Sequence, residues 1–394
     1  MMTRFAIALG LAALLLGTAA SVDAQEKKVR IGWSISKSGF LAVATNVQIQ
    51  AYELWREQVN VRGGLDIGGK EKRQVEYVIY DDQSDSGKIP QIYEKLINDD
   101  KVDLIFTPYA TPLHIAMTAV VEKNRMPAIG NTASSTNIRE MGGRYMFWTW
   151  PAPDLFVPVI VDFLQNVGVK SAALMTLQLP VNLEYKKFTV PLLNEKGIKL
   201  GVNQEYPPDI KDVTTMAQSI KASNVDAVIG YSYPGDSILY IDKAREIDIK
   251  APLQFLLIAP HIPFIINKYG KTLDGFTTIA FWSPSVKEWP RAKPFYDAYK
   301  KRWNEIPDYG DTVISYLTCE IMEQAVAKVG LDREKLRETI ATGTFETIAG
   351  PIRFEKQNNA STQPGISQIQ NGEPQLVWPP KIATGKYQPK TGWN

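Results

Sequence analysis

Short apolar runs alternate along the chain with stretches whose apolar residues fall at helical spacing. The runs at residues 29–34, 74–80, 104–107 and 126–129 have the length of strands. The stretches between them place their apolar residues three or four positions apart, which predicts helices. Strands that alternate with helices form a mostly parallel sheet covered on both faces. The pattern therefore predicts an α/β fold, in which ligands bind beyond the carboxyl ends of the strands.

The alternation starts again after the segment FWTWPAP at residues 147–153, where two prolines interrupt it. New strands are expected at residues 171–176, 199–204, 227–230 and 253–258. The second part of the chain thus repeats the plan of the first. We expect two doubly wound parallel-sheet lobes, each with helices on both faces of its sheet.

The remaining segments predict that the chain crosses between the lobes three times. A crossing is expected after residue 147, another after residue 280 and a third at Gly350. Residues 25–147 with 281–350 then form an N-terminal lobe, and residues 148–280 with 351–394 form a C-terminal lobe.

The start of the chain has the pattern of a secretory signal peptide. Arg4 precedes an apolar run at residues 5–20, and a small-x-small site ends at Ala24. Because this run is shorter than the about 20 residues of a membrane-spanning helix, we expect residues 1–24 to be removed after Ala24. The single cysteine, Cys319, excludes an intramolecular disulfide and a lipid-anchored cysteine at the cleavage point.

The charge of the chain is nearly balanced, with Lys+Arg 44 against Asp+Glu 42. Nucleic-acid-binding proteins carry a clear positive excess, so no nucleic-acid partner is expected. A hydrophobic content of 44% with 10% aromatic residues is typical of a globular protein. These aromatic residues are numerous enough to line a pocket as well as a core.

Two neighbouring strand ends carry hydroxyl groups and small residues. Thr111 has the chemistry of a helix N-cap and Pro112 that of a first helical residue, directly after the turn that holds Tyr109. The next strand ends in the hydroxyl-rich segment NTASST at residues 131–136. Free backbone N–H groups at a helix start attract anions. These residues predict one wall of a site for a carboxylate ligand, although two capped helices without a ligand would show the same pattern.

The sequence lacks the motifs of the common enzyme classes. Its 2 histidines, His114 and His261, lie on different predicted lobes without nearby cysteines or acids at metal-ligand spacing. Neither a nucleophile elbow nor a phosphate-binding loop nor a dinucleotide fingerprint occurs. We therefore expect a binding protein rather than an enzyme, with no metal and no cofactor.

Several segments together resemble the type I periplasmic solute-binding proteins of the branched-chain amino acid (Leu/Ile/Val) uptake family. The similarity covers essentially the whole chain after the leader. The segments that carry it are residues 29–32, 61–69 with its two Gly-Gly pairs, 80–82 (YDD), 127–129 (PAI) and 350–354 (GPIRF). The resemblance implies the type I periplasmic binding protein fold, in which two lobes close over a ligand, and a location in the periplasm.

The resemblance also implies ligand contacts. In that family a Ser or Thr hydroxyl and the backbone N–H groups of the next turn hold the ligand's carboxylate. By alignment these positions are Thr111 and the trio Thr132, Ala133 and Ser134. An aromatic residue on a turn of the second lobe corresponds to Tyr233 or its neighbour Tyr231.

The chain departs from the amino acid binders of the family at three places. The end of a late strand in the second lobe, where an acid would pair with the ligand's ammonium, reads IAPHI at residues 258–262. The family's Tyr-Gly-x-Gly loop is replaced by LPVN at residues 179–182, and its first-loop aromatic falls near Ala44, with Phe40 close by. Since an unpaired ammonium in a closed cleft is costly, the missing acid argues against a free α-amino acid.

We therefore expect a carboxylate with an apolar or aromatic body, such as a benzoate- or phenylpropenoid-type acid. Thr111 and Ser134 would hold the carboxylate, and aromatic rings would cover the body. The remaining candidates for the site are Tyr109, Tyr231, Tyr233, Phe40, His261 and Trp282.

The expected partners are those of an importer. The resemblance implies that the protein, as a monomer, delivers its ligand to an inner-membrane ABC permease with ATPase subunits. Two alternatives stay open from the sequence. The ligand could be a branched-chain amino acid, an amide or urea, and the partner could be a membrane signalling receptor that the protein serves as a sensor subunit.

Overall fold

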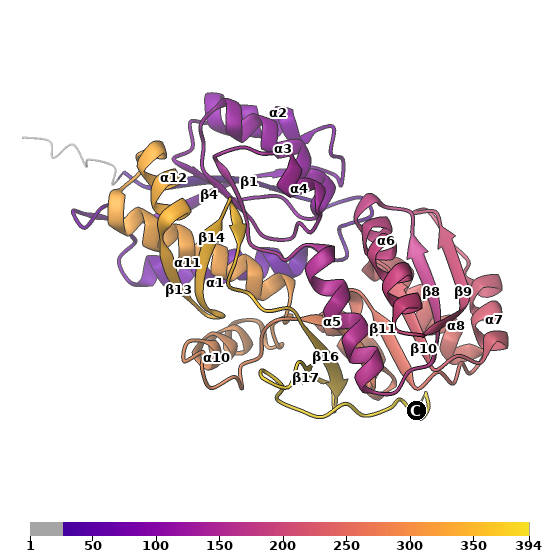
Figure 1. Cartoon of the computed structure of the whole chain (residues 1–394). Helices are drawn as coiled ribbons and strands as arrows, with labels where there is room; N and C mark the ends of the chain where they lie inside the picture. The colour runs from indigo at the N-terminus through magenta and orange to yellow at the C-terminus, as the bar shows by residue number, and fades with distance from the viewer. Residues whose placement is uncertain (1–26, 394) are drawn as a thin grey trace, which may run out of the picture.

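The computed structural model describes residues 27–393 of the chain. The predicted signal peptide and its cleavage site after Ala24 lie outside these residues. Figure 1 shows two α/β lobes side by side, with helix α5 (Pro153–Asn166) packed against α6 (Pro180–Glu195) and β16 (Gly365–Gln370) of the second lobe. The predicted fold class is confirmed: strands and helices alternate in both lobes, and most strand pairs are parallel.

The first lobe contains two sheets. In one, β1 (Val29–Ile35) lies between β4 (Val75–Asp81) and β5 (Leu104–Ile105), and both neighbours run parallel to it. The strand in the centre is the first in sequence, so the order changes direction between β1 and β5. This is the kind of position at which open α/β sheets bind ligands.

The second sheet of this lobe has the order β13-β14-β15-β7-β6. Its strands are β6 (Ala128–Gly130), β7 (Met146–Trp148), β13 (Thr344–Thr347), β14 (Gly350–Glu355) and β15 (Asn358–Asn359). A small hairpin, β2 (Leu65–Asp66) with β3 (Lys72–Arg73), lies outside both sheets.

The second lobe has one seven-stranded sheet with the order β17-β16-β12-β11-β10-β8-β9. The five strands from β8 to β12 are parallel, and β16 and β17 are antiparallel additions at one edge. The bounds are β8 (Ser171–Leu177), β9 (Lys199–Tyr206), β10 (Ala227–Tyr231), β11 (Leu253–Leu256), β12 (Phe276–Ala280), β16 (Gly365–Gln370) and β17 (Glu373–Trp378). Here the order changes direction between β8 and β10.

Helices cover the sheets of both lobes. In the first lobe α1 (Asn46–Val61) packs against α11 (Asp311–Val329). The other helices are α2 (Ile89–Glu94), which continues as a π-helical turn (Lys95–Asp99), α3 (Thr111–Lys123), α4 (Asn137–Glu140), α6 (Pro180–Glu195), α7 (Thr214–Ser223), α8 (Pro234–Glu246), α9 (Pro263–Tyr269), α10 (Ala292–Trp303) and α12 (Arg333–Thr342), with short 3-10 turns at Ala259–His261 and Gly270–Leu273. Within residues 27–393, no helix is long and apolar enough to cross a membrane.

The chain crosses between the lobes three times, and one crossing differs from the prediction. The first two follow β7 and β12. The third was predicted at Gly350, but β14 pairs with β13 and β15 pairs with β7, so residues 350–359 belong to the first lobe. The chain reaches the second lobe only at β16, which pairs with β12. The physical reason is that the turn at residues 347–350 closes a local hairpin instead of a crossover.

Candidate functional site

A cavity of about 30 Å³ lies between the lobes, at the carboxyl ends of their strands. It adjoins the two places where the strand order changes direction, β1/β5 in the first lobe and β8/β10 in the second. Its lining residues are Tyr109, Ala110, Thr111, Thr132, Ser134, Trp150, Val181, Tyr185, Tyr233, Leu257, Ile258, Ile279 and Asp311. Both lobes contribute to this set, so the cavity exists only while the lobes are together.

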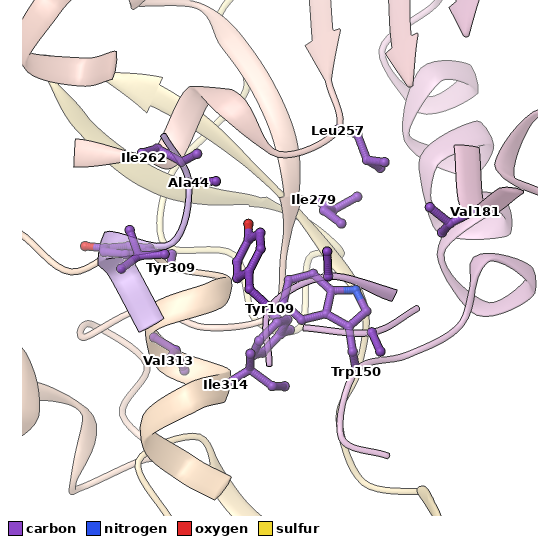
Figure 2. Packing of buried hydrophobic residues seen from close by; sticks show 14 of the residues in the cluster. Ala44, Tyr109, Trp150, Val181, Leu257, Ile262, Ile279, Tyr309, Val313 and Ile314 are labelled. Carbon is purple, nitrogen blue, oxygen red and sulfur yellow. The ribbon is translucent and has the colours of Figure 1, made fainter. Parts of the chain in front are cut away.

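Aromatic rings form much of the wall of the cavity. Figure 2 shows Tyr109 and Trp150 next to each other, between Ile314 of α11 on one side and Leu257 and Ile279 of the second lobe on the other. Trp150 is held edge-on by Phe281, with ring centroids 5.3 Å apart. Tyr185 and Tyr233 add two more rings from the second lobe. The site therefore offers large, rigid apolar faces to the body of a ligand.

The start of α3 borders the cavity with free hydrogen-bond donors. Thr111 is the first helical residue and not the N-cap as predicted, because Ala110 takes that position with φ 70 and ψ 150. The Thr111 Oγ1 accepts a hydrogen bond from the Ser134 N–H at 3.1 Å, which leaves its own proton available. In the described chain, the N–H groups of Thr111 and Ala133 have no protein acceptor. One hydroxyl and two backbone N–H groups can thus bind an anion. We call the start of α3 and the turn at residues 131–136, which carry these groups, the anion corner.

Two of the predicted hydroxyls are used by the protein itself. Ser134 Oγ donates to the carbonyl of Pro151 at 2.9 Å. Thr132 Oγ1 accepts from the Ala110 N–H at 3.0 Å and donates to Oδ1 of Asn131 at 3.3 Å. Both side chains line the cavity, yet their protons are directed at the turns that hold the corner together. Of the hydroxyls at this corner, that of Thr111 is the one whose proton is free.

His114 supports this corner from behind. The ring is fully buried, with Nδ1 2.9 Å from the Ala110 carbonyl and Nε2 3.2 Å from Oδ1 of Asn131. Burial lowers the pKa of His114 to about 4, so the ring is neutral near pH 7. The side chain joins the turn before α3 to the turn after β6.

Asp311, at the start of α11, adds a carboxylate to the cavity wall. Its Oδ2 accepts a hydrogen bond from the hydroxyl of Tyr109 at 2.6 Å. Burial is the main cause that raises the pKa of Asp311 to about 7, and the charge of Asp308 adds to it. Asp308 is itself buried and accepts the N–H groups of Gly310 and Thr312 at 2.8 and 3.2 Å.

His261 lies beside the buried acids Asp308 and Asp311 and is not part of the cavity wall. Its Nε2 lies 3.1 Å from Oδ2 of Asp308, but the orientation does not meet hydrogen-bond geometry, so both atoms lack a partner within residues 27–393. Burial lowers the pKa of His261 to about 4. His261 comes from the second lobe and Asp308 from the first, so the two approach each other across the cleft.

Three other predicted contact residues lie away from the cavity. Tyr231 stacks behind Tyr185, with ring centroids 5.2 Å apart. Trp282 is buried in another part of the core, where its indole N–H donates to the Ile348 carbonyl at 2.8 Å. Phe40 is 53% exposed on the loop after β1. In this structure Tyr233, and not Tyr231, is the aromatic residue of the β10 turn that faces the cavity.

The sequence prediction missed several lining residues. Trp150 stands in the proline-bearing crossover, and Tyr185 lies in the second turn of α6, whose first turn takes up the segment at residues 179–182 that was expected to be a loop. Asp311 opens a long helix, where an acid is common for helix stability alone. A signal for Asp311 was present in the segment PDYGD at residues 307–311, which places two acids and a glycine directly before an apolar helix.

Glu184 of the second lobe binds the turn at residues 131–136 of the first lobe across the cleft. Its carboxylate accepts the Thr136 N–H at 2.7 Å, the Thr136 hydroxyl at 3.0 Å and the Ser135 hydroxyl. These residues follow Ala133 and Ser134 directly. The turn that contributes to the anion corner is therefore also the turn that Glu184 contacts when the lobes are closed.

Fold and cavity together define a two-lobed protein with a cavity between its lobes, as in proteins that bind small molecules. Comparison with known proteins agrees: the family model described as Periplasmic binding protein matches residues 28–373. The chain therefore belongs to the periplasmic binding protein family, and the predicted relationship to Leu/Ile/Val-binding proteins is confirmed. It is 24% identical to Leu/Ile/Val-binding protein homolog 7 of Brucella melitensis, over 97% of this chain and 98% of that protein.

Solved structures with the same fold hold different ligands. The branched-chain amino acid transporter substrate binding protein LivJ of Streptococcus pneumoniae, in complex with isoleucine, has 19% identity and a TM-score of 0.79, covering 90% of this chain and 100% of that one. An ABC transporter solute binding protein of Rhodopseudomonas palustris, in complex with benzoate, has 18% identity and a TM-score of 0.79, covering 93% and 98%. At these identities the comparison establishes the fold, and the ligand has to be argued from the site.

Proposed function

We propose that this protein is the substrate-binding subunit of an ABC importer and captures a small aromatic carboxylate between its lobes. The observation that carries the proposal is the free donor set at the start of α3, namely the Thr111 hydroxyl and the N–H groups of Thr111 and Ala133. Thr111 lines a cavity with four aromatic side chains in its wall, and Ala133 is not itself a lining residue but stands between two of them, Thr132 and Ser134. A carboxylate suits the donors, and a flat apolar body suits the rings.

The aromatic rings favour an aromatic acid over a flexible aliphatic one. Tyr109, Trp150, Tyr185 and Tyr233 supply large contact areas, and the first three are packed against other side chains or hydrogen-bonded to them. A rigid ligand loses little conformational entropy on binding, so rigid walls and a rigid ring match each other. The ligand of the Rhodopseudomonas palustris protein named above is such an acid.

The proposed cellular role follows the family. Residues 1–24 would direct export and be removed after Ala24, and the monomeric mature protein would deliver its ligand in the periplasm to an inner-membrane permease with ATPase subunits. Ligand contacts with both lobes would favour the closed form, which the permease would recognise.

One observation favours a second candidate, a branched-chain amino acid. The prediction against amino acids rested on the missing acid at residues 258–262. Asp311, however, brings a carboxylate to the cavity from the first lobe, where it could pair with an ammonium group. The Streptococcus pneumoniae relative is named for such ligands.

Isothermal titration calorimetry of the mature protein with benzoate, 4-hydroxybenzoate, leucine, valine, urea and acetamide tests the proposal. We expect an aromatic acid to bind most tightly and Thr111→Val to weaken it about 10- to 100-fold, since a hydrogen bond to a charged group contributes about 1.5–3 kcal/mol. Thr118→Val is the matched control, because the Thr118 hydroxyl donates to the His114 carbonyl inside α3. Tight binding of leucine or valine alone would establish the second candidate, and equal losses in both variants would contradict the role of Thr111.

A further inference from the structure

Asp311 is the one carboxylate among the described residues that line the cavity, and that lining contains no lysine, arginine or histidine. The side chain is 3% exposed, so water solvates it poorly. A buried carboxylate without a cationic partner is costly, and proteins keep such groups where a ligand or a hydrogen-bond network compensates for them. The charge of Asp311 therefore calls for an explanation that the protein alone does not supply.

The hydrogen bonds of Asp311 leave one oxygen open. Oδ2 accepts from the hydroxyl of Tyr109. Within residues 27–393, no side-chain or backbone donor reaches Oδ1, although this atom is absent from the fully enclosed atoms that lack a partner. Because Asp311 lines the cavity, the open oxygen is available to a bound molecule.

The surrounding groups do not neutralise Asp311. Asp308 adds a second negative charge, and the buried ring of His261 is neutral near pH 7. Tyr109 and Tyr233 are phenols whose pKa values burial raises, so they stay uncharged. No neighbour among these supplies a positive charge, so the ionised form of Asp311 is disfavoured without a ligand, and a donor on a bound ligand would stabilise it.

We propose that Asp311 determines specificity by binding a hydrogen-bond donor on the body of the ligand, either a hydroxyl or an ammonium group. This inference rests on the proposed function, because Thr111 at the start of α3 would hold the carboxylate while Asp311 at the start of α11 binds the second group. The favoured ligand is then a hydroxylated aromatic acid, and a bare aromatic acid is a poorer one. Repulsion between the carboxylate of the bare acid and an ionised Asp311 would weaken the binding of that acid further.

The experiment compares aromatic acids that carry a donor on the body with one that carries none. Calorimetry at pH 8 measures the affinities of benzoate, 3-hydroxybenzoate, 4-hydroxybenzoate and L-phenylalanine for the natural protein, Asp311→Asn and Thr111→Val. For the natural protein we expect a ligand with a donor to bind about 10- to 100-fold more tightly than benzoate. The hydroxybenzoates separate a hydroxyl from the ammonium of phenylalanine. In Asp311→Asn this preference should fall to less than about threefold, because an amide binds a donor more weakly than a carboxylate does.

The outcomes separate the two proposals. An unchanged preference in Asp311→Asn, with Thr111→Val still weakening every ligand, overturns the role of Asp311 and leaves the proposed function intact. Failure of all these acids to bind the natural protein overturns both. Should Asp311→Asn not fold, the preference of the natural protein for 4-hydroxybenzoate over benzoate is measured from pH 5 to pH 9. It should rise as Asp311 ionises, and a constant preference overturns the inference.

Discussion

Glu184 of the second lobe accepts the backbone N–H of Thr136 in the first lobe at 2.7 Å. The contact spans the cleft and is strengthened by the hydroxyls of Thr136 and Ser135, which donate to the same carboxylate. A carboxylate that caps free N–H groups near the start of a short helix, here α4, is a favourable arrangement. The contact exists only with the lobes closed, so Glu184 stabilises the closed form.

Replacement of Glu184 should shift the protein toward the open form. In Glu184→Gln the amide nitrogen cannot accept the hydrogen bonds, so we expect about a tenfold loss of ligand affinity, equivalent to about 1.4 kcal/mol. Small-angle X-ray scattering should show a larger radius of gyration at a subsaturating ligand concentration. Glu195→Gln on the exposed end of the same helix is the control. Equal affinities for the two variants would contradict a role of Glu184 in closure.

Ala110 adopts a backbone conformation that costs energy and positions the anion corner. Its φ of 70 with ψ 150 is unfavourable for a residue with a side chain, at about 1–3 kcal/mol. Ala110→Gly should therefore keep or raise the free energy of unfolding by up to about 1 kcal/mol, after the entropy gained by the unfolded chain. The control Ala119→Gly, on the exposed face of α3, should lower it by about 1 kcal/mol. Similar losses in both variants, measured by urea unfolding, would speak against strain at Ala110.

The fold followed from the sequence because its signals are local. Each strand and helix of the two parallel-sheet lobes has its own apolar period, and the parallel order then places the strand ends together. The third crossing did not follow, because residues 350–355 read as a strand in either lobe. Only their pairing with β13 decides the lobe, and that pairing depends on a turn that holds Gly350 at φ 83.

The site followed from the sequence only in its first half. Thr111 and the turn at residues 131–136 lie close in sequence, and turn chemistry identified them. Asp311 reaches the same cavity from a helix that starts 200 residues after Thr111, and no local pattern links the two. Tyr231 and Tyr233 also show the limit of the sequence. Both are tyrosines at the same strand end, so the sequence does not tell which of them reaches the site. The structure places Tyr233 at the cavity and Tyr231 behind it.

Substitution of two tryptophans should separate an effect on stability from an effect on binding: Trp282, which the sequence predicted at the site, and Trp150, which the structure places there. Trp282→Ala removes a fully buried ring away from the cavity and should lower the free energy of unfolding by about 3–5 kcal/mol. The ligand affinity of the folded fraction should change less than about twofold, since the ring has no place in the cavity wall. Trp150→Ala should weaken binding about tenfold or more, because this ring lines the cavity. Urea unfolding gives the free energy of unfolding, and calorimetry gives the ligand affinity. A loss of affinity in Trp282→Ala but not in Trp150→Ala would show that Trp282 belongs to the site.

Asp308 should make the stability of the protein depend on pH in a predictable direction. Burial raises its pKa to about 7, against about 4 in the unfolded chain, so the folded state binds more protons between these values. Stability from this group is therefore full below pH 4 and is lost as the pH rises through 7, with a size of a few kcal/mol at most, on the order of 1.4 per pKa unit.

The variant Asp308→Asn removes this dependence. The groups that face Asp308 are the carboxylate of Asp311, the ring of His261 and the N–H groups of Gly310 and Thr312. An amide keeps an acceptor for the two N–H groups and turns a donor toward Nε2 of the neutral His261, 3.1 Å from the oxygen it replaces. We expect the free energy of unfolding of Asp308→Asn to exceed that of the natural protein at pH 8 and to match it near pH 5. The exposed-site control Asp209→Asn should parallel the natural protein at every pH, and the same parallel course for Asp308→Asn would show that Asp308 is ionised in the folded state throughout.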